Sequence, residues 1–307
     1  MTTMKTQLEQ LQMDLHTYDC DNHMETLTLF PGITLSFITI NSPHLSVHHK
    51  ALDHVIEINY CRSGRLGWSM GNGNKIHLGS GDFSIHTMKS CADSEIELPN
   101  GSYSGLKLCI DLLEVENKPP LLLEETDLNF ETLYENFCQN GQFSSFAGNE
   151  ETQAIFSFFY DQPASLQLTY YKLKLIELLL YLYKQDSSSF NQLSAYQSEQ
   201  IEIVHKIHEQ MILHMDERFT IESLSKQYLM NPTTLKTVFK AVYGNSIAAH
   251  IKEHRMEKAA KLLLTTELSV AEIATQVGYG NQSKFTAAFK EAYNVLPKEY
   301  RKKHYSL

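Results

Sequence analysis

Several features that mark particular classes of protein are scarce or missing in this chain of 307 residues. It has one tryptophan and eight prolines, and no apolar run approaches the roughly 18 residues that a membrane-spanning helix needs. Residues 1–21 are polar and lack the apolar core of a secretory signal. We therefore expect a soluble cytoplasmic protein, long enough for two domains with separate cores.

Cysteine and metal-ligand patterns are also sparse. The five cysteines are odd in number and widely spaced, without a Cys-x-x-Cys, which argues against a disulfide framework or a zinc finger. A cupin-type enzyme needs two histidines one residue apart followed by a carboxylate, and that pattern is missing. We expect buried free thiols at Cys61 and Cys109, no catalytic residues, no metal and no other cofactor. The histidines that could serve as metal ligands in this part of the chain are His44, His48, His49, His54, His77 and His86.

Negative charge prevails overall but is unevenly distributed. Residues 1–200 hold 11 Lys and Arg against 25 Asp and Glu, a net charge of −14. Residues 201–307 hold 15 Lys and Arg against 11 Asp and Glu, a net charge of +4. This asymmetry is expected when only the last part of a chain contacts nucleic acid.

The first two thirds of the chain change from strand pattern to helix pattern. Alternating apolar residues and glycine-rich turns in residues 26–111 predict half-buried strands in a small barrel or jelly roll. Apolar residues at helical spacing follow, and the wide stripe of the last helix fits either a dimer face or burial within its own subunit. We predict a barrel over 1–125, a helical segment over 126–185, a polar linker over 186–198 and a DNA-binding domain over 199–307.

A repeat near the C-terminus is the most informative pattern. Residues 221–225 recur as 270–274, offset by 49 positions, and apolar residues of a following helix recur with an offset of 50. Each copy predicts a short helix, a turn and a second helix, with Thr220, Asn231, Ser269 and Asn281 as N-caps. The repeated apolar residues are Leu235, Phe239 and Tyr243 in the first copy, and Phe285, Phe289 and Tyr293 in the second.

Polar residues remain on the outer face of the second helix in each copy. They are mostly donors and small residues, as a helix near base edges and phosphates requires. The long helix expected from Ser246 to about Leu264 would fix the distance between the two reading helices. The predicted DNA-binding residues are Thr233, Thr234, Lys236, Thr237 and Lys240 in the first copy, and Gln282, Ser283, Lys284, Ala287 and Lys290 in the second.

Residues 201–304 resemble the C-terminal domain of AraC/XylS-type bacterial transcriptional regulators. The resemblance rests on residues 220–225, 239–244, 255–259, 273–279 and 297–301. It implies seven helices, promoter binding and transcription activation, after an N-terminal cupin-like β-barrel that senses a small molecule. It also implies base contacts from Thr233, Lys236 and Thr237, and from Gln282, Ser283 and Ala287, where Ala287 replaces the longer side chain often found in the family.

The N-terminal part resembles regulators of siderophore uptake of the pyochelin and yersiniabactin type. The resemblance rests on residues 60–65 and 81–86. It implies an iron–siderophore complex as one candidate ligand, although a Gly-Asp turn occurs in many barrels. The candidate ligand-binding residues are Tyr60, Arg62, Trp68 and His86, for which core packing or surface charge is the simpler explanation.

These patterns predict an α+β chain, with a cupin-like barrel and packed helices followed by two tandem helix-turn-helix units joined by a long helix. The leading hypothesis is a ligand-responsive, sequence-specific transcription activator that reads two adjacent major-groove segments. Its expected partners are double-stranded promoter DNA, a small-molecule effector, RNA polymerase and a second copy of the chain, without a membrane. Two alternatives stay open: a cupin-type metal enzyme with an accessory DNA-binding domain, or a ligand-independent regulator whose barrel only dimerises.

Overall fold

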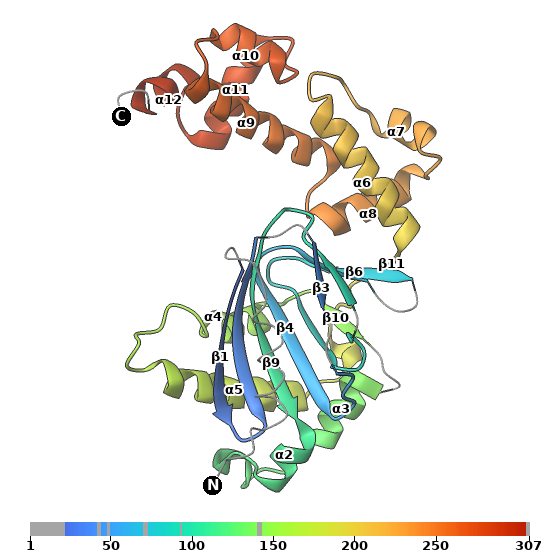
Figure 1. Ribbon diagram of the computed structural model, residues 1–307, viewed down its shortest axis with the longest axis vertical. Helices are drawn as coiled ribbons and strands as arrows, with labels where there is room; N and C mark the ends of the chain where they lie inside the picture. The colour runs from blue at the N-terminus through green and yellow to red at the C-terminus, as the bar shows by residue number, and fades with distance from the viewer. Residues whose placement is uncertain are drawn as a thin grey trace. The chain divides into compact units, whose positions relative to one another are not determined.

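The computed structural model describes residues 22–41, 44–47, 50–69, 73–92, 94–139 and 143–304 (Figure 1). The chain divides into two compact units, Met1–Ser198 and Glu199–Leu307. Cys20, His48 and His49 lie outside the described residues, as does the side chain of His44.

The first unit contains two antiparallel sheets. The six-stranded sheet has the order β1-β2-β9-β4-β7-β10, and the five-stranded sheet has the order β11-β6-β5-β8-β3. The strands of the first sheet are β1 (His23–Phe30), β2 (Ile33–Ile40), β9 (Tyr103–Asp111), β4 (Val55–Gly64), β7 (Phe83–Thr87) and β10 (Ser144–Phe146). Those of the second are β11 (Tyr196–Gln197), β6 (Asn74–Leu78), β5 (Leu66–Ser69), β8 (Ser94–Glu97) and β3 (His44–Val47).

The central strands are buried on both faces, which differs from the half-buried strands predicted from the sequence. In β4, Ile56 and Ile58 pack with the helices, whereas Cys61 belongs to the cluster between the two sheets. Successive side chains of a strand point to opposite faces. Polar residues at alternate positions, such as Glu57 and Asn59, are therefore buried as well, each about 4% exposed.

Four helices cover the outer face of the six-stranded sheet (Figure 1). The segment predicted as helical, 126–185, is interrupted by β10, whose residues pair with β7. The helices are α2 (Leu112–Asn117), α3 (Phe130–Cys138), α4 (Glu150–Ser157) and α5 (Gln167–Tyr183). All four described cysteines, Cys61, Cys91, Cys109 and Cys138, are buried free thiols, which confirms the expectation for Cys61 and Cys109.

The segment predicted as a linker, residues 186–198, packs against the first unit. The Phe190 side chain is buried among core aromatics, including Phe83 and Phe146. Strand β11 then pairs with β6, and the Ser198 hydroxyl donates to the Gly73 carbonyl over 2.8 Å. The polar composition of the segment reflects its exposed side chains, while its backbone is held by the sheet.

The second unit is all-helical. Its seven helices over 199–304 match the number that the family resemblance implied. They are α6 (Ser198–Leu213), α7 (Ile221–Gln227), α8 (Pro232–Tyr243), α9 (Ile247–Thr265), α10 (Val270–Gln276), α11 (Gln282–Tyr293) and α12 (Pro297–His304). In the described part of the whole chain, no helix combines the length and the apolar character that crossing a membrane requires.

Candidate nucleic-acid interface

The helix starts of the two repeated units form as the sequence predicts. Thr220 and Ser269 each cap a first helix through a capping box, and Asn231 and Asn281 cap α8 and α11. Pro232 stands at the first position of α8, where its missing N–H costs little. Each such cap stabilises its helix by about 1 kcal/mol, so both reading helices have fixed starting points.

Apolar residues anchor the inner faces of α8 and α11. Leu235 and Phe239 in α8, and Phe285 and Phe289 in α11, are fully buried. Burying such a side chain contributes about 1.5–3 kcal/mol, which fixes the rotation of each helix about its axis. The pattern weakens at the end of α11, because Ala292, which corresponds to the buried Val242 of α8, is exposed.

The outer faces carry the predicted DNA-binding residues. Nine of the ten are exposed, and Thr234 is half-buried. The Thr237 hydroxyl donates to the Thr233 carbonyl over 2.9 Å within α8, so its donor is already engaged. The structure thus brings the ten residues together in two groups, one on each helix, within the unit of positive net charge.

Helix α9 joins the two helix-turn-helix units. Its 19 residues correspond to about 28 Å at 1.5 Å per residue, comparable with one turn of B-DNA. Two arginines tie it to neighbouring segments: Arg255 Nε donates to the Met215 carbonyl over 2.9 Å, and Arg301 Nε of α12 donates to the Leu263 carbonyl over 3.1 Å. Burial lowers the pKa of Arg255, although the group stays charged.

The turns of the two helix-turn-helix units share one backbone conformation but differ in sequence. Leu229 has φ +51°, and Gly278, its counterpart 49 positions later, has φ +79°. Gly280 is the additional residue that changes the repeat offset from 49 to 50. The Leu229 side chain is 93% exposed, whereas a Cβ on Gly278 would lie 2.4 Å from the Met215 carbonyl oxygen.

The four candidate ligand-binding residues of the first unit lie on opposite faces of its main sheet. Tyr60 stacks on Phe156 at 4.4 Å, and the Arg62 guanidinium lies 4.1 Å from the Tyr160 ring on the helix-covered side. Trp68 and His86 instead lie between the sheets, around Phe143. Because strand side chains alternate, the two pairs cannot line one cavity together.

Polar side chains fill much of the space between the sheets. Among the described residues, Asn59 Nδ2, Ser84 Oγ and His86 Nδ1 are buried without a hydrogen-bond partner. Glu57 Oε2 lies 3.5 Å from His86 Nε2, and Glu57 Oε1 lies 3.3 Å from Lys107 Nζ. Buried polar atoms without partners are costly, so this interior is chemically suited to a polar ligand.

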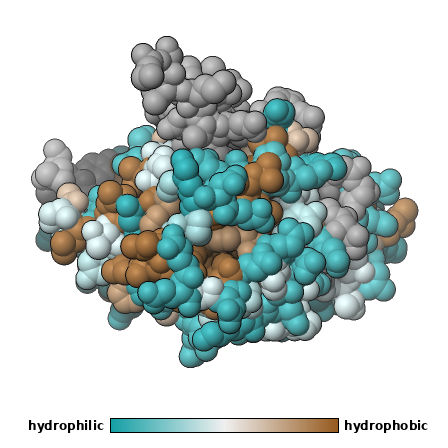
Figure 2. Space-filling model, turned by 90° about the horizontal axis from the view of Figure 1, so that it is seen from below, coloured by the Kyte–Doolittle hydropathy of each residue, from teal (hydrophilic) through white to brown (hydrophobic). Residues whose placement is uncertain are grey.

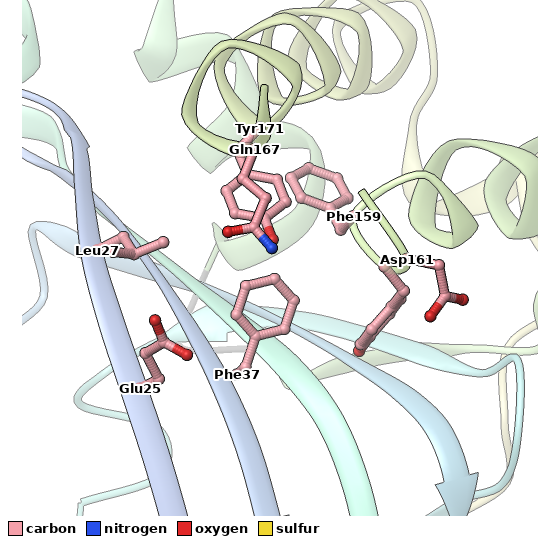
Figure 3. Close-up of a pocket in the computed structure, with 8 residues that line it drawn as sticks. Glu25, Leu27, Phe37, Phe159, Asp161, Gln167 and Tyr171 are labelled. Carbon is pink, nitrogen blue, oxygen red and sulfur yellow. The ribbon is translucent and has the colours of Figure 1, made fainter. Parts of the chain in front are cut away.

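A separate pocket of about 180 Å³ lies between the outer sheet face and the helices (Figure 3). Aromatic side chains from β2 and the α4–α5 region line it, together with Glu25 of β1 and Asp161 of the α4–α5 connection. None of the four candidate ligand-binding residues lines it. Its lining residues are Glu25, Leu27, Phe37, Phe159, Tyr160, Asp161, Gln167 and Tyr171.

Comparison with known proteins identifies the second unit. Residues 224–303 match a family model described as a helix-turn-helix domain, and the matched regulators are of the AraC type. This unit is an AraC-type helix-turn-helix domain. It is 35% identical over 83 residues to the regulator AlkR of Acinetobacter baylyi, and 42% identical over 69 residues to the xylose operon regulatory protein of Escherichia coli.

These similarities concern the AraC-type domain alone. They span 27% and 18% of the two regulators, and 27% and 22% of this chain. Among solved structures, the C-terminal domain of AraT from Geobacillus stearothermophilus is 38% identical, covering 33% of this chain and 84% of that domain's chain, with a TM-score of 0.32. ToxT from Vibrio cholerae, solved with an unsaturated fatty acid, covers 88% of this chain and 94% of ToxT at 14% identity, with a TM-score of 0.36.

Sequence reasoning missed two positioning features of the AraC-type domain. The role of Arg255 as a tie to the Met215 carbonyl depends on residues 40 positions apart, and no local pattern announces it. Gly278 signalled the left-handed turn in the second helix-turn-helix unit, but Leu229 at the equivalent position conceals it in the first helix-turn-helix unit. Aligning the two repeats residue by residue reveals the correspondence.

Proposed function

We propose that the chain is a sequence-specific DNA-binding transcription regulator whose helices α8 and α11 enter two adjacent segments of the major groove. The observation that carries this proposal is the pair of capped, outward-facing polar helices joined by the 19-residue helix α9. Two reading helices spaced by about one turn of DNA suit consecutive major-groove segments on one side of the duplex.

The residue types divide the proposed contacts into two kinds. Gln282 suits bidentate recognition of adenine, while Thr233, Lys236, Thr237, Ser283 and Ala287 complete the proposed set facing bases. Lys240 and Lys290 lie in the last turns of their helices, where charges suit phosphate contact, and Thr234 and Lys284 flank the reading faces. Because the Thr237 hydroxyl already donates within α8, the second helix carries more of the specificity.

Selection from a random double-stranded DNA pool tests this proposal. We expect the full chain to enrich two conserved blocks whose centres lie about 10.5 base pairs apart. A matched selection with Gln282→Ala should lose information in one block only. Failure of the native chain to enrich any sequence, with and without a cell extract as a source of effector, would refute the reading function.

The first unit is proposed to be a cupin-like sensor whose ligand binds between the sheets. The unpaired polar atoms of Asn59, Ser84 and His86 support a polar ligand, and an iron–siderophore complex is the first class to test. Thermal unfolding with ferric pyochelin should show a rise in Tm for the native chain and a smaller one for Asn59→Ala. Tyr60→Phe, on the opposite sheet face, should respond like the native chain, and equal responses from all three would exclude this location.

An apolar surface on α5 supports the proposal that the regulator dimerises. Leu168 and Leu173 are each about half exposed on a helix whose other side is buried. The face of the molecule seen in Figure 2 carries several groups of apolar side chains separated by polar ones. A dimer would place two AraC-type domains on one promoter. In analytical sedimentation, the Leu173→Glu variant should contain a larger fraction of monomer than the native chain. The Lys172→Glu variant should contain the same fraction as the native chain.

Activation through RNA polymerase completes the proposal. A bound regulator raises transcription when it offers the polymerase a favourable contact at the promoter. Transcription in vitro from a promoter carrying the selected sequence should rise when the chain is added. A fall in transcript would make the protein a repressor, with the same DNA-reading surface.

A further inference from the structure

Three histidines of the second unit converge on one point. His208 comes from α6, and His250 and His254 lie one turn apart on α9. One ring nitrogen of each lies within 4.8 Å of those of the other two. We propose that His208, His250 and His254 form a binding site for one divalent transition-metal ion of the zinc type, which clamps α6 to α9.

The spacing of the ring nitrogens fits such an ion. His250 Nε2 and His254 Nε2 lie 3.1 Å apart and share a hydrogen bond, which an ion bound between them would replace. Two nitrogens bound tetrahedrally to one Zn²⁺ at 2.0–2.1 Å lie about 3.3 Å from one another. One ring nitrogen of His208, within 4.8 Å of both, would supply the third ligand.

The protonation state of the three rings also suits them to bind a cation. Burial and the neighbouring histidines lower the pKa of His208 to about 4 and that of His250 to about 3. Both rings are therefore neutral at pH 7 and keep a lone pair. Imidazole in its neutral form is the usual nitrogen ligand of Zn²⁺, Ni²⁺ and Cu²⁺.

A carboxylate orients one of the three rings. Glu257 Oε2 lies 3.2 Å from His254 Nδ1. A proton on Nδ1 donated to this carboxylate leaves the lone pair on Nε2, which faces His250. Ligating histidines commonly use such a carboxylate to fix their tautomer and orientation, so Glu257 is a positioning residue for the proposed ion.

The surroundings make the site both accessible and consequential. His208 and His254 are half-buried, so an ion can reach them, while His250 is buried beneath. The Tyr243 ring of α8 stacks on His208 at 4.4 Å and lies 4.8 Å from His250. An ion at this point therefore stabilises the packing behind the end of the first reading helix.

The second group of ligand-type residues, Glu57, His86 and Cys91 in the first unit, is a weaker competitor. Lys107 Nζ lies 3.3 Å from the Glu57 carboxylate, so that charge is already compensated. The Cys91 thiol donates to the same carboxylate over 3.3 Å, and burial raises its pKa well above the usual value. A thiol held protonated in this way is a poor metal ligand.

Calorimetric titration of the full chain with Zn²⁺, and absorption spectra with Co²⁺, test the proposal. We expect one ion per chain, a tetrahedral Co²⁺ spectrum and a rise in Tm on binding. His208→Gln and His254→Gln should each weaken binding at least tenfold. Glu257→Gln, at a mostly exposed side chain, should weaken it about 10–100-fold.

Two variants serve as controls. His214 Nδ1 also lies 3.5 Å from the carboxylate of a glutamate three residues later, but His214 does not belong to the histidine cluster. The His214→Gln variant should therefore bind the ion like the native chain. Cys91→Ser should also bind unchanged. Undiminished affinity in both His208→Gln and His254→Gln, or loss of binding in Cys91→Ser, would overturn the proposal.

Discussion

Replacing Gly278 by alanine should destabilise the AraC-type domain far more than a surface glycine substitution normally does. Gly278 has φ +79° in the turn before α11, a conformation that costs other residues about 1–2 kcal/mol. The added Cβ would also lie 2.4 Å from the Met215 carbonyl oxygen and 2.7 Å from Arg255 Nη2. Both atoms belong to the hydrogen-bonded tie between α9 and the segment after α6.

The magnitude follows from adding these two effects. Forcing a methyl group into a packed site typically costs about 1–3 kcal/mol, because neighbours must shift. Together with the backbone term, Gly278→Ala should lower the free energy of unfolding by about 2–5 kcal/mol. That is a large fraction of the stability of a domain, which is typically about 5–15 kcal/mol.

Urea unfolding followed by far-ultraviolet circular dichroism measures this loss, and Gly280→Ala is the matched control. Gly280 lies two residues later in the same turn and lacks a positive φ, and a methyl group added there would meet no atom within 4 Å. Its substitution should change stability by less than about 0.5 kcal/mol. Equal effects of the two variants would show that neither the left-handed conformation nor the Met215 contact constrains this turn.

Four further outcomes are expected. Leu229→Gly should raise the free energy of unfolding by up to about 1 kcal/mol in the same urea assay, because it relieves a positive φ at an exposed residue. Gln282→Ala should cost about 1–3 kcal/mol in discrimination at one base pair, and equal affinity for every variant of the selected site would contradict base contact. Lys240→Ala should weaken all DNA sequences alike and reduce the salt slope of binding by about one, unless Lys240 lies away from phosphate. Stability should fall as the pH drops below about 6.5, because His208 and His250 take up protons in the unfolded state before they do so in the folded state, where their pKa values are about 4 and about 3; His208→Gln should reduce this dependence and leave the part due to His250.

Local signals predicted the reading helices well. Caps such as Asn231 and Asn281, and buried anchors such as Phe239 and Phe289, depend on residues within a few positions, and the structure confirms them. The seven helices of the second unit were likewise implied by the family resemblance. The repeated pattern could be recognised because each helix-turn-helix unit buries an apolar face of its own.

Long-range juxtapositions were the part that the sequence concealed. The histidine cluster joins His208 to residues more than 40 positions away, and only the spacing of His250 and His254, one helical turn apart, hinted at it. In the first unit, alternation placed Tyr60 and His86 on opposite faces, but their strands had to be paired before this was evident. Strand β10 escaped notice because three residues carry no clear period.

The pairing of β11 with β6 determines how the first unit can be studied in isolation. A fragment that stops at the end of α5 would lose β11 and leave the backbone groups of β6 unpaired at an open sheet edge. It would also lose Phe190, exposing the aromatic cluster that this residue covers. Open edges recruit other strands and promote aggregation. A sensor fragment should therefore extend through Ser198, and shorter ones are expected to precipitate rather than to report on ligand binding.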